Sequence, residues 1–202
     1  MPGTGLRASR RALLGALAAS ALPRGVAADD PLGVLIGLVG ERLALMRAVA
    51  ESKWNSGASV EDQAREVGLV AGVVALAPTY ELDPGQAAAF FRAQIEAAKC
   101  VESALIARWA AARAGPFGAA ADLQATIRPR LDRLTPALLA ALAEAVPAVK
   151  RDGADRIAAA SRLDDPVMAV AMARALQPLL ELAGARAGAF RPAPGPVGPM
   201  GR

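Results

Sequence analysis

Eight charged side chains occur at ordered spacings in a chain that is otherwise rich in alanine, leucine and valine. They are Arg42, Lys53, Asp62, Arg65, Glu66, Lys99, Glu102 and Arg128. Charged side chains are almost never fully buried unless they are paired. A helical protein that aims several of them along one seam is therefore expected to hold a small ionic ligand there. The set favours an anion with a polar middle.

The first pair of cations lies on one face of an expected helix. Arg42 and Lys53 are 11 residues apart, which is about 1100° of helical rotation and roughly 20° from alignment. Two long side chains leaning inwards at this separation could hold opposite ends of a dianion. The alternative is that both are solvated cations on an amphipathic helix.

Two further charged groups follow at helical spacing. Asp62, Arg65 and Glu66 occupy positions i, i+3 and i+4, so one acid could hold Arg65 while the other accepts a hydroxyl. Lys99 and Glu102 are three residues apart on a later helix. Each group could equally be an exposed ion pair of little energetic weight.

Composition excludes most other chemistry. The chain has 202 residues, 54% of them hydrophobic, which fits one domain with a sizeable core. It contains no histidine and one cysteine, Cys100, so imidazole catalysis, histidine or thiolate metal sites and an internal disulfide are excluded. We expect no metal and no cofactor. The chemistry must use Arg, Lys, Asp, Glu and backbone groups.

The amino terminus has the features of a cleavable export signal. Arginines precede an apolar stretch at 12–22 that is too short for a stable membrane anchor, and small residues at 26–28 offer a cleavage site before Asp29. The Arg10–Arg11 pair is similar to a twin-arginine signal, with Sec export as the alternative. We therefore expect a periplasmic or secreted protein with no membrane anchor after cleavage, although an anchoring N-terminal helix is the other interpretation.

Removing the signal changes the electrostatic interpretation. Four of the 23 basic residues and none of the 19 acidic residues lie in residues 1–28, so the remaining chain is formally neutral. It offers no overall positive field for nucleic acid, and aromatic residues for base stacking make up only 3% of the chain. We expect no nucleic-acid partner.

The remaining chain predicts an all-α helical bundle with long N-terminal helices and additional C-terminal helices. Expected helices span residues 31–54, 59–76, 83–113, 121–127, 135–150, 154–161 and 166–183. Ser59 is the expected cap of the second helix, Pro129 a kink or fresh start, and Thr135 the start of a later helix. We expect one domain over residues 29–183 and a disordered Pro/Gly-rich tail over 184–202.

The joint spacing of these motifs resembles a known family. Its elements are Arg42–Leu43, Lys53–Trp54, Asp62 with Arg65–Glu66, Gln94–Ile95 with Glu102, and Ile127–Arg128–Pro129. Together, over residues 31–142, they resemble the exported all-helical chorismate mutases. The resemblance implies conversion of chorismate to prephenate, without a cofactor, by a protein that forms a homodimer.

The resemblance assigns roles at the two ends of the substrate. Arg42 and Arg128 would bind its two carboxylates through charge-assisted contacts. Lys53 and Glu102 would flank the ether oxygen as its bond to carbon breaks. The reaction is an intramolecular rearrangement that needs no nucleophile, so the absence of histidine is compatible with this activity.

The residues Asp62, Arg65 and Glu66 would lie near the ring hydroxyl of the substrate. The resemblance places Asp62 and Glu66 near the ring hydroxyl, with Arg65 at the same end of the pocket. Related enzymes have a hydroxyl side chain where this chain has Ala98, and Lys99 receives no role. Two other interpretations remain: a non-catalytic exported protein that binds a small dicarboxylate, and a structural bundle with solvated charges.

Overall fold

The computed structural model describes residues 30–189, and their side chains as far as residue 184. Within this range the chain is all-α, as predicted, and contains no β-strand. Its elements are α1 (Pro31–Ala44), α2 (Met46–Ser56), α3 (Gln63–Leu76), the 3₁₀ turn η1 (Ala77–Tyr80), α4 (Pro84–Ala111), the π-helical turn η2 (Leu123–Ile127), α5 (Arg128–Ala160) and α6 (Pro166–Ala189). The expected signal peptide lies outside the described residues.

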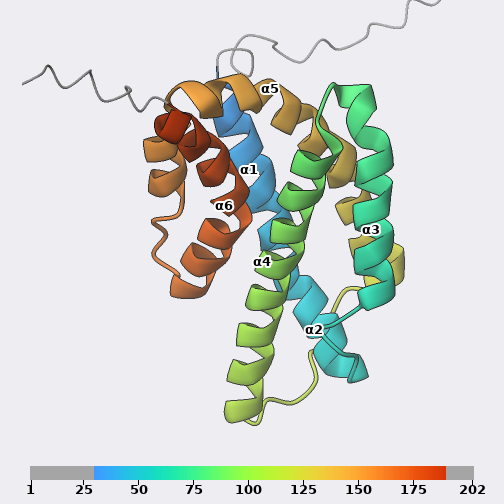
Figure 1. The fold of residues 1–202 in the computed structure, drawn as a ribbon. Helices are drawn as coiled ribbons and strands as arrows, with labels where there is room; N and C mark the ends of the chain where they lie inside the picture. Colours follow the sequence, from blue (N-terminus) through green and yellow to red (C-terminus); the bar gives the residue numbers. More distant parts are fainter. Residues whose placement is uncertain (1–29, 190–202) are drawn as a thin grey trace, which may run out of the picture.

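The long helix α4 is the centre of the bundle (Figure 1). It packs against α6 on one side and against α2 and α3 on the other, while α5 packs on α1 and α6. Phe90 and Phe91 on α4, Leu35 on α1 and Leu138 on α5 are fully buried between them. This core fixes α1, α4 and α5, the helices that carry several of the charged residues.

The first expected helix is broken in two, so the prediction of one helix over residues 31–54 is wrong. At Leu45 the backbone N–H donates to the carbonyl of Arg42 at 3.2 Å, which is a tighter turn than the α-helical pattern. The break separates Arg42, near the end of α1, from Lys53, near the end of α2.

The second expected helix begins later than predicted. Ser59 accepts from the Glu61 N–H in a turn instead of capping a helix. The cap is Asp62, whose Oδ1 accepts from the Arg65 N–H at 3.3 Å. An aspartate in a non-helical conformation that satisfies a first-turn donor is a favourable N-cap. The helix that follows, α3, buries only Val73.

The third expected helix is confirmed, because Asp83 caps α4 by accepting from the Gln86 N–H at 2.8 Å. The predicted start of a new helix near Pro129 is also confirmed, since α5 begins at Arg128. The expected start at Thr135 is wrong: α5 continues through Pro136, and the Thr135 hydroxyl donates to the Leu131 carbonyl.

Near Gly153, where we expected one helix to end, α5 contains a residue with a non-helical backbone conformation. Asp152, with φ −155° and ψ 18°, interrupts α5 just before Gly153. The last helix, α6, continues to Ala189, beyond the expected start of the tail at residue 184. Its segment Pro166–Gly184 is long and apolar enough to cross a membrane. In the structure it packs against α4 and α5.

Candidate active site

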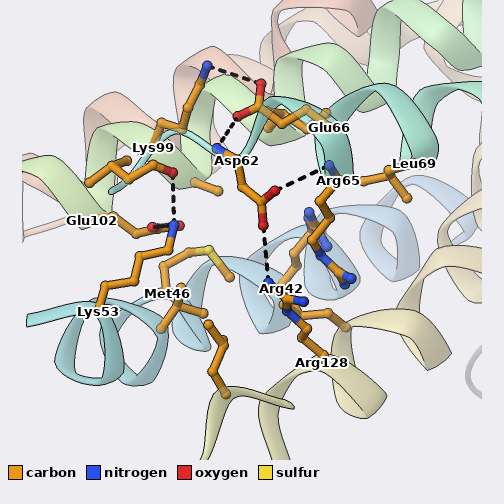
Figure 2. A pocket seen from close by; sticks show the side chains of 16 residues that line it. Arg42, Met46, Lys53, Asp62, Arg65, Glu66, Leu69, Lys99, Glu102 and Arg128 are labelled. Carbon is orange, nitrogen blue, oxygen red and sulfur yellow. Dashed lines mark hydrogen bonds and ion pairs between the residues drawn. The ribbon is translucent and has the colours of Figure 1, made fainter. Parts of the chain in front are cut away.

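One pocket gathers all seven residues that the sequence singled out as catalytic or substrate-binding. It encloses about 590 Å³ of empty space, open solvent at its mouth included. Its walls come from α1 to α5, the turn before α3 and η2 (Figure 2). The charged residues that line it are Arg42, Lys53, Asp62, Arg65, Glu66, Lys99, Glu102 and Arg128. The charged side chains that the sequence places at helical spacings therefore line one cavity.

Three guanidinium groups meet at one end of this pocket, those of Arg42, Arg65 and Arg128 (Figure 2). Arg42 is only 6% exposed, and its buried Nε has no hydrogen-bond partner among the described residues. Burial, and secondarily the nearby Arg65 cation, lowers the pKa of Arg42 to about 10. A buried cation without a partner at the wall of a cavity is suited to bind an anion.

The other two arginines at this end have protein partners. Arg65 Nη2 donates to Asp132 at 2.9 Å, and Arg128 Nη2 donates to Asp62 at 3.1 Å. Arg128 also donates to Gln124 at 2.9 Å. The expectation that an acid of its own helix holds Arg65 is therefore wrong. These contacts orient both guanidinium groups and leave other N–H donors for a ligand.

Lys53 and Glu102 form a buried ion pair at the opposite end. Lys53 Nζ lies 2.7 Å from Glu102 Oε2 and also donates to the Val60 carbonyl at 2.8 Å. Desolvation raises the pKa of Glu102, while the hydrogen bond and charge of Lys53 and the charge of Arg42 oppose that shift. Arg42 and Lys53 are both buried, so the alternative of two solvated cations is wrong.

Glu66 faces away from the ion pair and contacts the start of its own helix. Its Oε1 accepts from the Asp62 N–H at 3.4 Å, and its Oε2 accepts from Lys99 at 3.4 Å. Gln94, part of the sequence pattern, does not line the pocket and instead donates to the Ala175 carbonyl at 2.9 Å. It ties α4 to α6.

Comparison with known proteins assigns the family. The model of chorismate mutase type II matches residues 34–103. A curated relative, the secreted chorismate mutase of Mycolicibacterium smegmatis, is 32% identical over 167 residues, which cover 82% of this chain and 89% of the relative. The chain belongs to the chorismate mutase family. The matched segment of the family model ends immediately after Glu102.

Solved chorismate mutases have the same fold. The Burkholderia thailandensis structure superposes with a TM-score of 0.69 at 36% identity, covering 75% of this chain and 99% of that one. The Burkholderia phymatum structure gives a TM-score of 0.69 at 28% identity, with coverage of 76% and 98%. A secreted chorismate mutase from Yersinia pestis, at 21% identity and a TM-score of 0.56, shares the fold alone.

Sequence reasoning gave no role to Asp132, which lies outside the pocket lining, or to most of the apolar residues of that lining. Asp132, the partner of Arg65, lies four positions after Arg128 and therefore on the same face of α5; that spacing is the signal that could have found it. Apart from Ile95 and Ala98, which belong to the resemblance, the apolar wall could not be recognised, because its members look like any core residue. It consists of Met46, Val49, Val60, Leu69, Ile95, Ala98, Leu123 and Leu131.

Proposed function

We propose that this chorismate mutase family member converts chorismate to prephenate by holding a folded substrate conformer in the pocket. The observation that carries the proposal is the division of charge. Guanidinium groups occupy one end, the Lys53–Glu102 pair occupies the other, and apolar side chains lie between them. Chorismate carries two carboxylates, an ether oxygen and an apolar ring, so it matches this arrangement.

Arg42 and Arg128 bind the two carboxylates in this proposal. Arg42 supports the role because it is buried with an unused Nε donor. Arg128, which Asp62 and Gln124 orient, has further N–H groups for a second carboxylate. Fixing both carboxylates brings the ends of the substrate together, and such preorganisation supplies a large part of the rate of an intramolecular reaction.

Lys53 and Glu102 act at the ether oxygen. Negative charge develops on this oxygen as the carbon–oxygen bond breaks, and a preorganised donor there is worth about 10²–10³ in rate. Lys53 donates through its N–H groups, whereas Glu102 donates only when protonated. The raised pKa of Glu102 favours the protonated form that this role requires.

Asp62, Glu66 and Arg65 form the wall near the ring hydroxyl in this proposal. Asp62 already accepts from Arg128 and, as a carboxylate, has further lone pairs for a hydroxyl donor. Ala98 lines the same pocket and provides no hydroxyl contact. The proposed hydrogen bonds to the substrate therefore come from charged groups.

The proposal also covers the cellular location and the oligomeric state of the enzyme. The similarity to a secreted relative supports export, and the Arg10–Arg11 pair leads us to propose the twin-arginine route. Mass spectrometry of the periplasmic product should find a chain that begins near Asp29, and a double lysine replacement of the pair should block export. We also propose a homodimer, which light scattering of the purified protein tests.

The catalytic proposal is tested with chorismate and the Lys53→Ala variant. The parent should consume chorismate and form prephenate, and the variant should bind the substrate but turn it over at least about 10²-fold more slowly. A protein that only binds dicarboxylates would bind chorismate equally in both forms and consume it in neither. That result would refute the proposed catalysis.

A further inference from the structure

The wall of the pocket that carries Asp62, Arg65 and Glu66 has little core packing to hold it. None of the residues from 54 to 72 is buried, and α3 is anchored to the core through Val73, far from its first turn. Leu69, one turn after Arg65, packs against the core but is only partly buried. The placement of the 60–66 segment, meaning residues 60 to 66, therefore depends largely on polar contacts.

Two lysines hold this segment from opposite sides. Lys53, inside the pocket, donates to the Val60 carbonyl at 2.8 Å. Lys99, on α4, contacts Glu61 at 3.1 Å and Glu66 at 3.4 Å. In Figure 2 the Lys99 ammonium group points towards Glu66 and away from the Lys53–Glu102 pair. Lys99 thus contacts the wall, and its ammonium group is directed away from the reacting end of the pocket.

Lys99 projects from a buried part of α4 and is surrounded by carboxylates. Its neighbours Ala98 and Val101 are buried in the core, and Glu96, one turn earlier on α4, lies 2.7 Å from its Nζ. The hydrogen bonds that Lys99 donates to Glu96, Glu61 and Glu66 raise its pKa despite partial desolvation. Two of these three carboxylates, those of Glu61 and Glu66, belong to the 60–66 segment, so Lys99 links that segment to α4.

The contacts continue from Lys99 to a substrate-binding arginine. Glu66, bound to Lys99, accepts the Asp62 N–H, and Asp62 Oδ2 accepts from Arg128 Nη2 at 3.1 Å. We propose that Lys99 is a positioning residue: its ion pairs with Glu61 and Glu66 set the place of Asp62 and, through it, the orientation of the Arg128 guanidinium group. This inference rests on the proposed chorismate mutase activity.

The effect should appear in substrate binding, and hence in kcat/KM, more than in stability. Exposed ion pairs contribute little to stability, whereas displacing a substrate-binding group by 1 Å can cost about 10²-fold in rate. Lys99→Met keeps the length of the side chain and removes the charge. We expect it to raise KM for chorismate about tenfold, to change kcat by less than about threefold, and to leave the helical spectrum unchanged.

Two single variants serve as controls. Lys99→Arg should restore KM to within about threefold of the parent, because it keeps the cation. Glu96→Gln removes the shortest ion pair of Lys99 but no contact to the 60–66 segment, so its KM should stay within about twofold of the parent. Equal losses in Glu96→Gln and Lys99→Met would overturn the inference, since the effect would then be general to the helix surface.

A double-mutant cycle separates positioning from direct substrate contact. If Lys99 acts through Asp62, then Lys99→Met should change KM less than about twofold in an Asp62→Asn background. A full tenfold rise in that background would mean that Lys99 touches the substrate itself, and the inference would be wrong. An unchanged KM for Lys99→Met alone would also overturn it.

The activity of the parent reports separately on the proposed function. A parent without mutase activity overturns both claims, whereas an active parent with a normal Lys99→Met variant overturns this one alone. If Lys99→Met lost its helical spectrum, Glu61→Gln would replace it, because Glu61 is largely exposed and its change cuts one contact. That variant should raise KM about threefold, and a parental KM would contradict the inference.

Discussion

Replacing Arg42 with methionine should make the protein more stable and nearly inactive. Arg42 is buried, its Nε has no partner among the described residues, and its pKa is lowered to about 10, first by burial and then by Arg65. The cation therefore destabilises the ligand-free fold. Methionine fills a similar volume without a charge, and substitutions of this kind in buried ionic sites are often stabilising.

The size of the gain follows from the pKa of Arg42. The decrease of the Arg42 pKa from 12.5 to about 10 corresponds to about 3 kcal/mol, and incomplete repacking leaves an expected gain of about 1–3 kcal/mol. Because the folded-state pKa is depressed, the penalty is fully present below about pH 10 and is relieved as the pH rises above that value. Unfolding at pH 7 therefore measures the whole effect.

Two measurements check this prediction on the same samples. Thermal unfolding should give Arg42→Met a higher Tm, by about 2–4 °C for each kcal/mol, while kcat/KM for chorismate falls at least about 10²-fold. A small dicarboxylate such as malate should raise the Tm of the parent and not that of the variant. A variant less stable than the parent, or one that keeps near-normal kcat/KM, would refute the role given to Arg42.

Three further substitutions test the rest of the pocket. Lys53→Ala should be nearly inactive at every pH tested, because the lysine donor to the ether oxygen is lost; substantial activity of this variant at any pH would contradict this. Glu102→Gln should stay active and flatten the alkaline fall of kcat/KM, since the parent loses its donor as the pH rises through the raised pKa of Glu102; an unchanged profile would remove Glu102 from the ether oxygen. Asp132→Asn should raise KM about threefold to tenfold with kcat nearly unchanged, because Arg65 loses its 2.9 Å ionic partner. A normal KM in steady-state kinetics would contradict this role of Asp132.

The sequence predicted the shared face of Arg42 and Lys53 although it missed the break between them. The tighter turn at Leu45 changes the path of the chain, yet both side chains line one pocket. The helical period was sufficient because the apolar residues around each of them, such as Val39 and Val49, are buried in the same core. Packing of that face preserved the alignment that the spacing indicated.

The pairing of charges could not be predicted from local spacing. Within α3, Asp62, Arg65 and Glu66 look like an intrahelical cluster, but Asp62 pairs with Arg128 and Arg65 with Asp132. These partners lie more than 60 residues away along the chain. They meet because the fold brings the first turn of α5 to the start of α3, and that arrangement depends on the whole core.

The most direct test follows the absorbance of chorismate in the presence of the purified protein. With chelator present and no cofactor added, we expect a saturable loss of chorismate, formation of prephenate, and near-complete loss of the rate in Arg42→Met. A helical, monodisperse protein that consumes chorismate no faster than the uncatalysed background would contradict the proposed activity.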